Sequence, residues 1–213
     1  MSRTARQTSK LRRRDPFDPD GFFMAIDLFF AGKGPVHQTM RRLVKRLEKA
    51  SIPYAVIGGM AVNVHGHQRM TRDVDFLLTR EGFADFQRLF VPKYYAALPG
   101  RPRRFVDLKN NQTLDILVTG LFPGSGKPGP ISFPDPFEVR ELRGKVHYIN
   151  LATLIQLKLA ARRHQDFADV VNLISIHNLD ESSLERLHSS VRPDFIECLE
   201  EKRREEEYEA RNG

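Results

Sequence analysis

The chain has 213 residues, 40% of them hydrophobic, which is enough for one domain with a sizeable core. Its single cysteine, Cys198, excludes an internal disulfide and a zinc site built from several cysteines. No uncharged apolar stretch reaches the roughly 18 residues needed to span a bilayer, and no apolar signal segment directly follows the basic N-terminus. We therefore expect a cytoplasmic protein with no membrane partner.

The positive charge is concentrated at one end of the chain. The net charge is +7, from 34 Lys and Arg against 27 Asp and Glu, and residues 1–14 hold six basic residues and no acidic one. The remaining 28 basic and 27 acidic residues nearly cancel. We predict that residues 1–19 form a disordered basic tail, which acts either as a solubilising arm or as a contact for a polyanion such as RNA.

Hydrophobic periodicity and turn residues divide the rest of the chain into a core of residues 20–150 and a helical C-terminal segment of residues 151–213. In the core, helices are predicted over 20–29, 36–50, 60–65 and 81–95. Strands are predicted over 54–57, 69–78, 105–108, 113–119, 137–142 and 146–149, with a Gly- and Pro-rich loop over 121–136. Helices over 151–163, 166–177, 181–189 and from 194 onward complete the chain. This order predicts an α/β (α+β) fold, with a mixed twisted sheet backed by helices.

Two carboxylates stand on one predicted strand, in the stretch TRDVDFLL. Because strand side chains alternate between faces, Asp73 and Asp75 point the same way, together with Thr71 and Arg69, while Val74 and Phe76 point into the core. Like charges so close together repel one another unless a cation neutralises them. Carboxylate ligands suit Mg²⁺ or Mn²⁺, so this pair predicts a divalent metal site. Salt bridges to Arg69, Arg72 or Arg104 are the purely structural alternative.

A third carboxylate would complete a two-metal site. Asp115 heads another apolar strand, TLDILV, and would join the pair if that strand lies beside the first. Three such carboxylates hold two metals that clamp an in-line phosphoryl displacement. Asp107, on the neighbouring predicted strand, is the rival for this role.

A glycine turn precedes the paired aspartates. In VIGGMAV a strand ends at Gly58 and Gly59, and a helix follows. Glycines allow close backbone approach, and the free N–H groups of a helix start attract phosphate. The order of features is a phosphate cradle, Asp-x-Asp, and then a distant strand aspartate.

In this order the chain resembles the polymerase-β-type nucleotidyltransferase superfamily, most strongly over 54–78 and again at Asp115 and over 151–174. Within it, the chain looks like the small branch that contains the AbiEii-like abortive-infection toxins. The segment LATLIQLKLAARRHQDFADVVNL matches a helix pair common there, with a lysine, arginines and then Asp-x-x-Asp.

The resemblance implies a role for each of these residues. Asp73 and Asp75 would bind both metals, and Asp115 would bind the metal that activates the acceptor hydroxyl. Gly58 and Gly59 would hold the nucleotide's triphosphate, with Lys158 and Arg69 as further phosphate contacts. Many members have a hydroxyl residue at the glycine turn, whereas this chain has Gly59 and Met60, so its cradle depends on backbone N–H groups.

The expected function is metal-dependent transfer of a nucleoside monophosphate from an NTP to an acceptor hydroxyl, with release of pyrophosphate. The acceptor can be a tRNA 3′ end, a protein or a small molecule, and an antitoxin is a further expected partner. The alternative is a non-catalytic member of the same fold that binds nucleotide, RNA or a partner protein.

Overall fold

The computed structural model describes residues 19–213. The predicted tail, residues 1–19, therefore lies outside the described residues except for Pro19, which opens the first helix. That helix, α1, spans Pro19–Phe30, one residue earlier than the sequence predicts.

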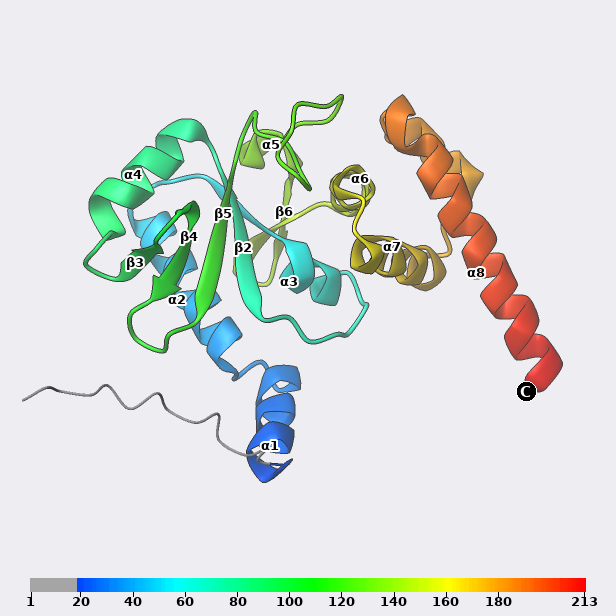
Figure 1. Cartoon of the computed structure of the whole chain (residues 1–213), viewed down its shortest axis with the longest axis horizontal. Coiled ribbons are helices and arrows are strands. Elements are labelled where there is room, and N and C mark those ends of the chain that lie inside the picture. The colour runs from blue at the N-terminus through cyan, green and yellow to red at the C-terminus, as the bar shows by residue number, and fades with distance from the viewer. Residues whose placement is uncertain (1–18) are drawn as a thin grey trace, which may run out of the picture.

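A seven-stranded mixed sheet forms the centre of the molecule, with the strand order β3-β4-β5-β2-β1-β7-β6 (Figure 1). Its strands are β1 (Tyr54–Ile57), β2 (Asp73–Leu78), β3 (Tyr95–Leu98), β4 (Arg101–Asp107), β5 (Thr113–Val118), β6 (Arg140–Arg143) and β7 (Val146–Ile149). Strand β2 pairs in parallel with β5 and antiparallel with β1, and β1 pairs in parallel with β7. The α/β (α+β) prediction is confirmed.

Helices cover both faces of this sheet. They are α2 (Pro35–Lys49), α3 (Gly58–Val64), α4 (Arg80–Phe90), α5 (Pro136–Val139), α6 (Leu151–Ala161), α7 (His164–His177) and α8 (Arg192–Asn212), with 3₁₀ turns η1 (Glu181–Arg186) and η2 (Ser189–Val191). Figure 1 shows α2 and α4 on one side of β2 and β5, α6 and α7 on the other, and α8 outermost.

The two faces of β2 differ as the alternation predicts. Val74 and Phe76 are fully buried, whereas Asp73 and Asp75 remain partly accessible on the opposite face. On the apolar side, Phe86 of α4 packs edge-on against Phe105 of β4, with ring centroids 5.0 Å apart. Burying such aromatic side chains anchors the sheet to its helices, so the carboxylate face is presented by a rigid strand.

Helix α2 forms as the periodicity predicts. Its buried residues Val36, Met40, Leu43, Val44 and Leu47 recur at helical spacing and lie in the core. Pro35 sits in its first turn, where a missing N–H costs nothing.

The predicted helix over 81–95 is too long, and a strand was missed beyond it. Helix α4 ends at Phe90, two residues before Pro92, because proline has no N–H to continue the helix. The chain then enters β3, where Tyr95 is fully buried and its ring stacks on Phe86. The apolar run over 94–98 belongs to the sheet and not to the helix.

Other element boundaries also differ from the predicted ones. Strand β2 begins at Asp73, so Arg69 and Thr71 precede it and lie in the loop after α3. Strand β4 begins at Arg101 and not at residue 105, because an arginine-rich run with a proline gives no apolar alternation to detect. Residues 137–142 divide between α5 and β6, and in place of the predicted helix over 181–189 the chain forms η1 and then enters η2 at Ser189.

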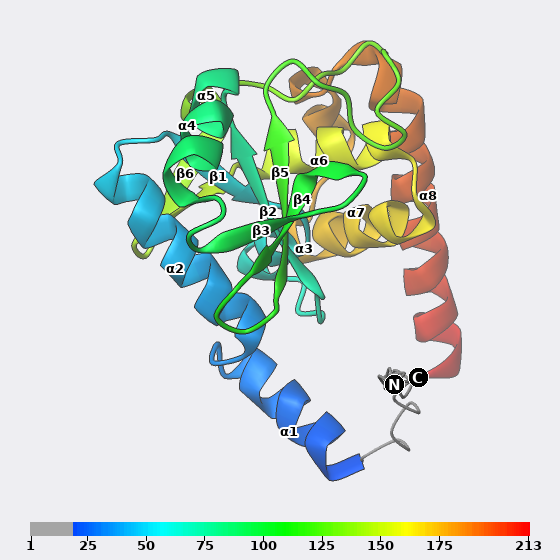
Figure 2. The same ribbon diagram turned by 60° about the vertical axis from the view of Figure 1, so that its left-hand side comes forward.

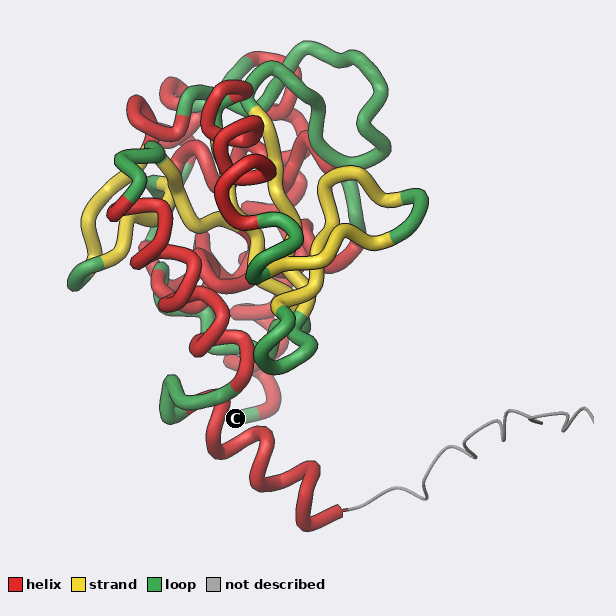
Figure 3. The backbone as a smooth tube through the Cα atoms, turned by 90° about the vertical axis from the view of Figure 1, so that its left-hand side faces the viewer, coloured by secondary structure: helices red, strands yellow, loops and turns green. Residues whose placement is uncertain are grey.

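The N-terminal helix projects from the body. Figures 2 and 3 show α1 leading away from the sheet beyond α2, at one end of the molecule. Its Phe23, Met24 and Phe30 side chains are exposed. Among the described residues, no helix has the length and apolar character needed to cross a membrane.

Candidate active site

Three aspartates meet on the accessible face of the sheet. Strands β2 and β5 run in parallel with Asp75 directly beside Asp115, and Asp73 lies two residues earlier on β2. All three line one cavity of about 540 Å³. The sequence prediction that these carboxylates converge is therefore confirmed, whereas their metal-binding and catalytic roles remain predictions.

The rival aspartate has a different position and partners. Asp107, at the end of β4, is buried and accepts hydrogen bonds from Arg42 of α2, at 2.6 Å, and from Thr39, at 3.0 Å. It does not line the cavity. Asp107 therefore ties α2 to the sheet, and Asp115 is the carboxylate that stands beside the pair.

Gly58 lies against Asp75. It follows Ile57, whose register partner on β2 is Asp75, and it has a φ of +63°. A Cβ atom at this position would lie 1.9 Å from the Oδ2 atom of Asp75. Both the backbone conformation and the lack of space therefore require glycine, and the glycine turn lies beside the carboxylates as the sequence predicts.

The side chain of Thr71 lies against Gly59. A Cβ atom at Gly59 would lie 2.6 Å from the Oγ1 atom of Thr71, which belongs to the loop before β2. Gly59 itself does not line the cavity, whereas Gly58 does. The predicted triphosphate cradle at the two glycines remains a prediction, with Gly58 the better placed of the two.

The carboxylates raise one another's affinity for protons. Burial raises the pKa of Asp75 to about 7, and the negative charges of Asp73 and Asp115 add to this effect. Burial also raises the pKa of Asp115, although the positive charge of Arg104 opposes it. The proximity of the three carboxylates thus adds to the effect of burial in raising the pKa of Asp75.

Arg104 of β4 bridges two of the aspartates. Its Nη2 atom lies 3.2 Å from Oδ2 of Asp73, and its Nε atom lies 3.6 Å from Oδ1 of Asp115. The structural alternative drawn from the sequence, a salt bridge from Arg104 to the pair, is thus present on Asp73. Asp75 has no such partner among the described residues.

Lys158 of α6 reaches the cavity but is held by carboxylates. Its Nζ atom lies 3.0 Å from Asp166 and 2.6 Å from Asp169, both on α7, and its side chain is 6% exposed. Lys158 and Asp166 line the cavity. The phosphate contact predicted for Lys158 stays a prediction.

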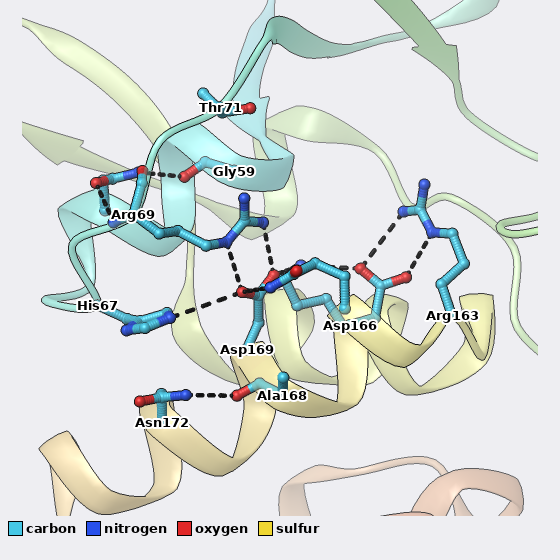
Figure 4. Close-up of polar contacts among 12 residues, drawn as sticks. Gly59, His67, Arg69, Thr71, Arg163, Asp166, Ala168, Asp169 and Asn172 are labelled. Carbon is cyan, nitrogen blue, oxygen red and sulfur yellow. Dashed lines mark hydrogen bonds and ion pairs between the residues drawn. The ribbon is translucent and has the colours of Figure 1, made fainter. Parts of the chain in front are cut away.

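Arg69 lies outside the cavity and is bound to Asp169. Its Nε and Nη2 atoms donate to the two oxygens of Asp169 at 2.6 and 2.7 Å, and it is not part of the cavity wall (Figure 4). Burial alone would raise the pKa of Asp169, but hydrogen bonds from Arg69 and Lys158 hold that pKa below its ordinary value. In this structure Arg69 joins the loop before β2 to α7, and its predicted phosphate contact stays untested.

Sequence reasoning gave Arg101, Arg103 and Arg163 no place in the site and named Arg104 only as a salt-bridge partner of the aspartates. Arg101, Arg103 and Arg104 come from β4, and Arg163 precedes α7 and donates to Asp166 (Figure 4). The run RPRR at 101–104 was a visible signal, but the strand was predicted to begin only at residue 105, so these arginines were not placed beside β5. The loop residues Gly124, Ser125 and Gly126 also line the cavity.

The donor chemistry of the site fits a hard divalent cation, because carboxylate oxygens are the ligands that Mg²⁺ and Mn²⁺ prefer. A divalent cation would offset the mutual repulsion of Asp73, Asp75 and Asp115, which adds to burial in raising the pKa of Asp75. As the described residues stand, however, no group of three or more His, Cys, Asp or Glu side chains is arranged to hold a metal ion. Arg104 occupies part of the space between Asp73 and Asp115 instead.

No family model and no curated protein matches the sequence. Among solved structures, the chain is similar to ANT(2″)-Ia in complex with adenylyl-2″-tobramycin, with 10% identity, a TM-score of 0.50, and coverage of 75% of this chain and 96% of that one.

The chain therefore has a nucleotidyltransferase fold.

Two further solved structures are more distant. One is an antigenic nucleotidyltransferase-like protein from Paracoccidioides brasiliensis, at 16% identity and a TM-score of 0.44, covering 76% of this chain and 91% of that one. The other is a putative nucleotidyltransferase from H. pylori, at 14% identity and a TM-score of 0.40, covering 82% and 91%. The likeness to the ANT(2″)-Ia structure shows the nucleotidyltransferase fold and does not show the activity.

Proposed function

We propose that this protein is a metal-dependent nucleotidyltransferase that moves a nucleoside monophosphate from an NTP to an acceptor hydroxyl and releases pyrophosphate. The observation that carries the proposal is the convergence of Asp73, Asp75 and Asp115 on adjacent strands, with Gly58 against Asp75, in one cavity. A cavity of about 540 Å³ is within the range of small-molecule sites.

Asp73 and Asp75 would hold the metal pair, and Asp115 would share the ion next to the acceptor. Bound Mg²⁺ or Mn²⁺ supplies charge neutralisation at the phosphates and lowers the pKa of the attacking hydroxyl. Asp115 would orient that hydroxyl and accept its proton. The backbone at Gly58, with the cations that line the cavity, would position the triphosphate for in-line attack on the α-phosphorus, with pyrophosphate as the leaving group.

The acceptor is left open among a tRNA 3′ end, a protein side chain and a small hydroxyl compound. The basic segment 1–14 and the arginines of β4 favour a phosphate-rich acceptor. We also propose, from the resemblance to AbiEii-like toxins, a cytoplasmic location and an antitoxin partner encoded beside this protein.

Transfer can be tested directly. The protein is incubated with Mg²⁺, each of the four α-³²P-labelled NTPs, and either total tRNA or a protein extract. We expect one NTP to label one acceptor class. Asp73→Asn, Asp75→Asn and Asp115→Asn should each reduce the rate by at least about a hundredfold.

The matched control is Asp85→Asn, which removes an exposed carboxylate from α4, far from the cavity wall. This variant should label the acceptor at the wild-type rate. If no acceptor becomes labelled from any α-³²P NTP, or if the three variants label as well as wild type, the proposal is wrong.

A second candidate is a non-catalytic protein that binds nucleotide, RNA or a partner. The favouring observation is the bridge from Arg104 to Asp73 and Asp115, which neutralises these carboxylates without any metal. Such a protein should bind its partner equally well after Asp73→Asn and Asp75→Asn, and it should transfer no label.

A further inference from the structure

Arg104 stands in a row of side chains that crosses the sheet. Arg104 on β4 is the register partner of Asp115 on β5, which in turn is the partner of Asp75 on β2. The guanidinium of Arg104 also lies 3.2 Å from Asp73, so it stands between the carboxylates of Asp73 and Asp115.

Two cations in the cavity are held very differently. Lys158 is paired with Asp166 and Asp169, and these three side chains are 0–6% exposed. Arg104, Asp73 and Asp115 are about 30% exposed, at 32%, 30% and 29%. Ion pairs at that exposure contribute little free energy and exchange readily with solvent and ions. Lys158 is therefore fixed, whereas Arg104 can leave its partners at small cost.

A divalent ion shared by Asp73 and Asp115 would compete with Arg104 for the same oxygens. Two cations that share the same carboxylate oxygens repel one another. Metal binding at this position therefore requires the guanidinium to move away, and the strand that carries it does not need to move.

We propose that Arg104 is a nucleotide-phosphate ligand that the nucleotide-free protein holds on Asp73 and Asp115. This inference rests on the proposed function. On binding of a metal–nucleotide complex, Asp73 and Asp115 would hold the metal, and the guanidinium of Arg104, released from them, would contact the phosphates. Arginine suits this exchange because its planar fork binds carboxylate and phosphate alike.

The exchange couples the two ligands. Without nucleotide, metal binding breaks the Arg104 ion pairs and Arg104 finds no new anionic partner. The affinity of the protein for bare metal is therefore lowered. With nucleotide, the phosphates supply a new partner for Arg104, so metal and nucleotide each strengthen the binding of the other. The protein would thereby select the metal–nucleotide complex over the free ion.

Opposite effects on the two ligands test the proposal. Binding of Mn²⁺ alone is titrated by electron paramagnetic resonance, and binding of α,β-methylene NTPs is titrated at saturating Mn²⁺. Arg104→Ala should bind Mn²⁺ about fivefold or more tightly than wild type. The same variant should bind the preferred nucleotide analogue about tenfold more weakly.

Arg88→Ala is the matched control, because Arg88 of α4 also forms an exposed ion pair, with Asp85, but does not line the cavity. It should leave the affinity for Mn²⁺ alone close to the wild-type value. Arg104→Lys, which keeps the charge but loses the fork, should retain weak Mn²⁺ binding and recover only part of the nucleotide affinity.

Each other outcome is decisive. If Arg104→Ala binds Mn²⁺ no tighter than wild type, or binds nucleotide equally well, the assignment of Arg104 is wrong and the proposed function stands. If neither wild type nor any variant binds Mn²⁺, with or without nucleotide, both are overturned.

Discussion

At the scale of single residues, Gly58 is the position most tightly constrained by its surroundings. Gly58→Ala would bring a methyl group within 1.9 Å of Asp75 and force an unfavourable φ. We expect this substitution to destabilise the protein by about 2–4 kcal/mol, combining backbone strain with a steric clash, as measured by urea unfolding. Gly144 has nearly the same φ, +62°, with open space around it. Gly144→Ala should therefore cost only about 1 kcal/mol, and equal losses at the two positions would disprove the clash.

Asp75 gives the protein a pH signature. Its pKa in the folded state is about 7, above its ordinary value of 3.8, because burial and then Asp73 and Asp115 disfavour its charge. Between these two values the folded state binds more protons than the unfolded state, so this residue makes stability fall as pH rises from about 4 to 7.

The pH dependence of stability that Asp75 causes can be measured in metal-free buffer. Asp75→Asn removes the titrating group, so its gain in Tm over wild type should be larger at pH 8 than at pH 5. Asp85→Asn, on the exposed surface of α4, provides the comparison. A Tm difference for Asp75→Asn that is the same at both pH values would contradict the raised pKa.

At the scale of elements, α6, α7 and the loop before β2 are joined by buried charges. Asp169 is fully buried and accepts hydrogen bonds from Lys158 and Arg69 (Figure 4). Asp169→Asn would leave Arg69 without its carboxylate partner and Lys158 with Asp166 alone, so we expect a loss of about 3 kcal/mol in unfolding free energy. Breaking the exposed Asp85–Arg88 pair on α4 with Asp85→Asn should cost less than about 1 kcal/mol. A small effect at Asp169 would show that the network is not stabilising α7.

The limits of sequence reasoning also appear at this scale. Asp73, Asp75 and Asp115 could be predicted together because each stands in a strongly apolar strand, where alternation fixes the face. Arg104 could be named only as a possible salt-bridge partner, because the strand was predicted to begin at residue 105 and the arginine-rich start of β4 lacks that alternation. Arg69 was expected on the aspartate face, but β2 begins at Asp73 and the loop turns Arg69 toward Asp169.

At the scale of the whole molecule, charge distribution predicts how an acceptor is bound. Deleting residues 1–14 removes six positive charges and leaves 28 basic against 27 acidic residues. If the acceptor is RNA, the truncated protein should bind tRNA more weakly, with a log K against log salt slope that is less steep by several units. Fluorescence anisotropy across a salt series measures both quantities. An unchanged slope would mean that this segment does not contact the polyanion, and it would leave the arginines of β4 as the candidate contact.

The account as a whole depends on Asp73, Asp75 and Asp115 binding divalent metal together with a nucleotide. Crystals grown with Mn²⁺ and the preferred α,β-methylene NTP allow the metal to be located by its anomalous scattering. We predict a peak within coordination distance of carboxylate oxygens from all three residues, with the nucleotide phosphates on its other side and Arg104 turned away from Asp73. A nucleotide bound in the cavity with no anomalous peak at these carboxylates, or a peak elsewhere on the protein, would contradict the account.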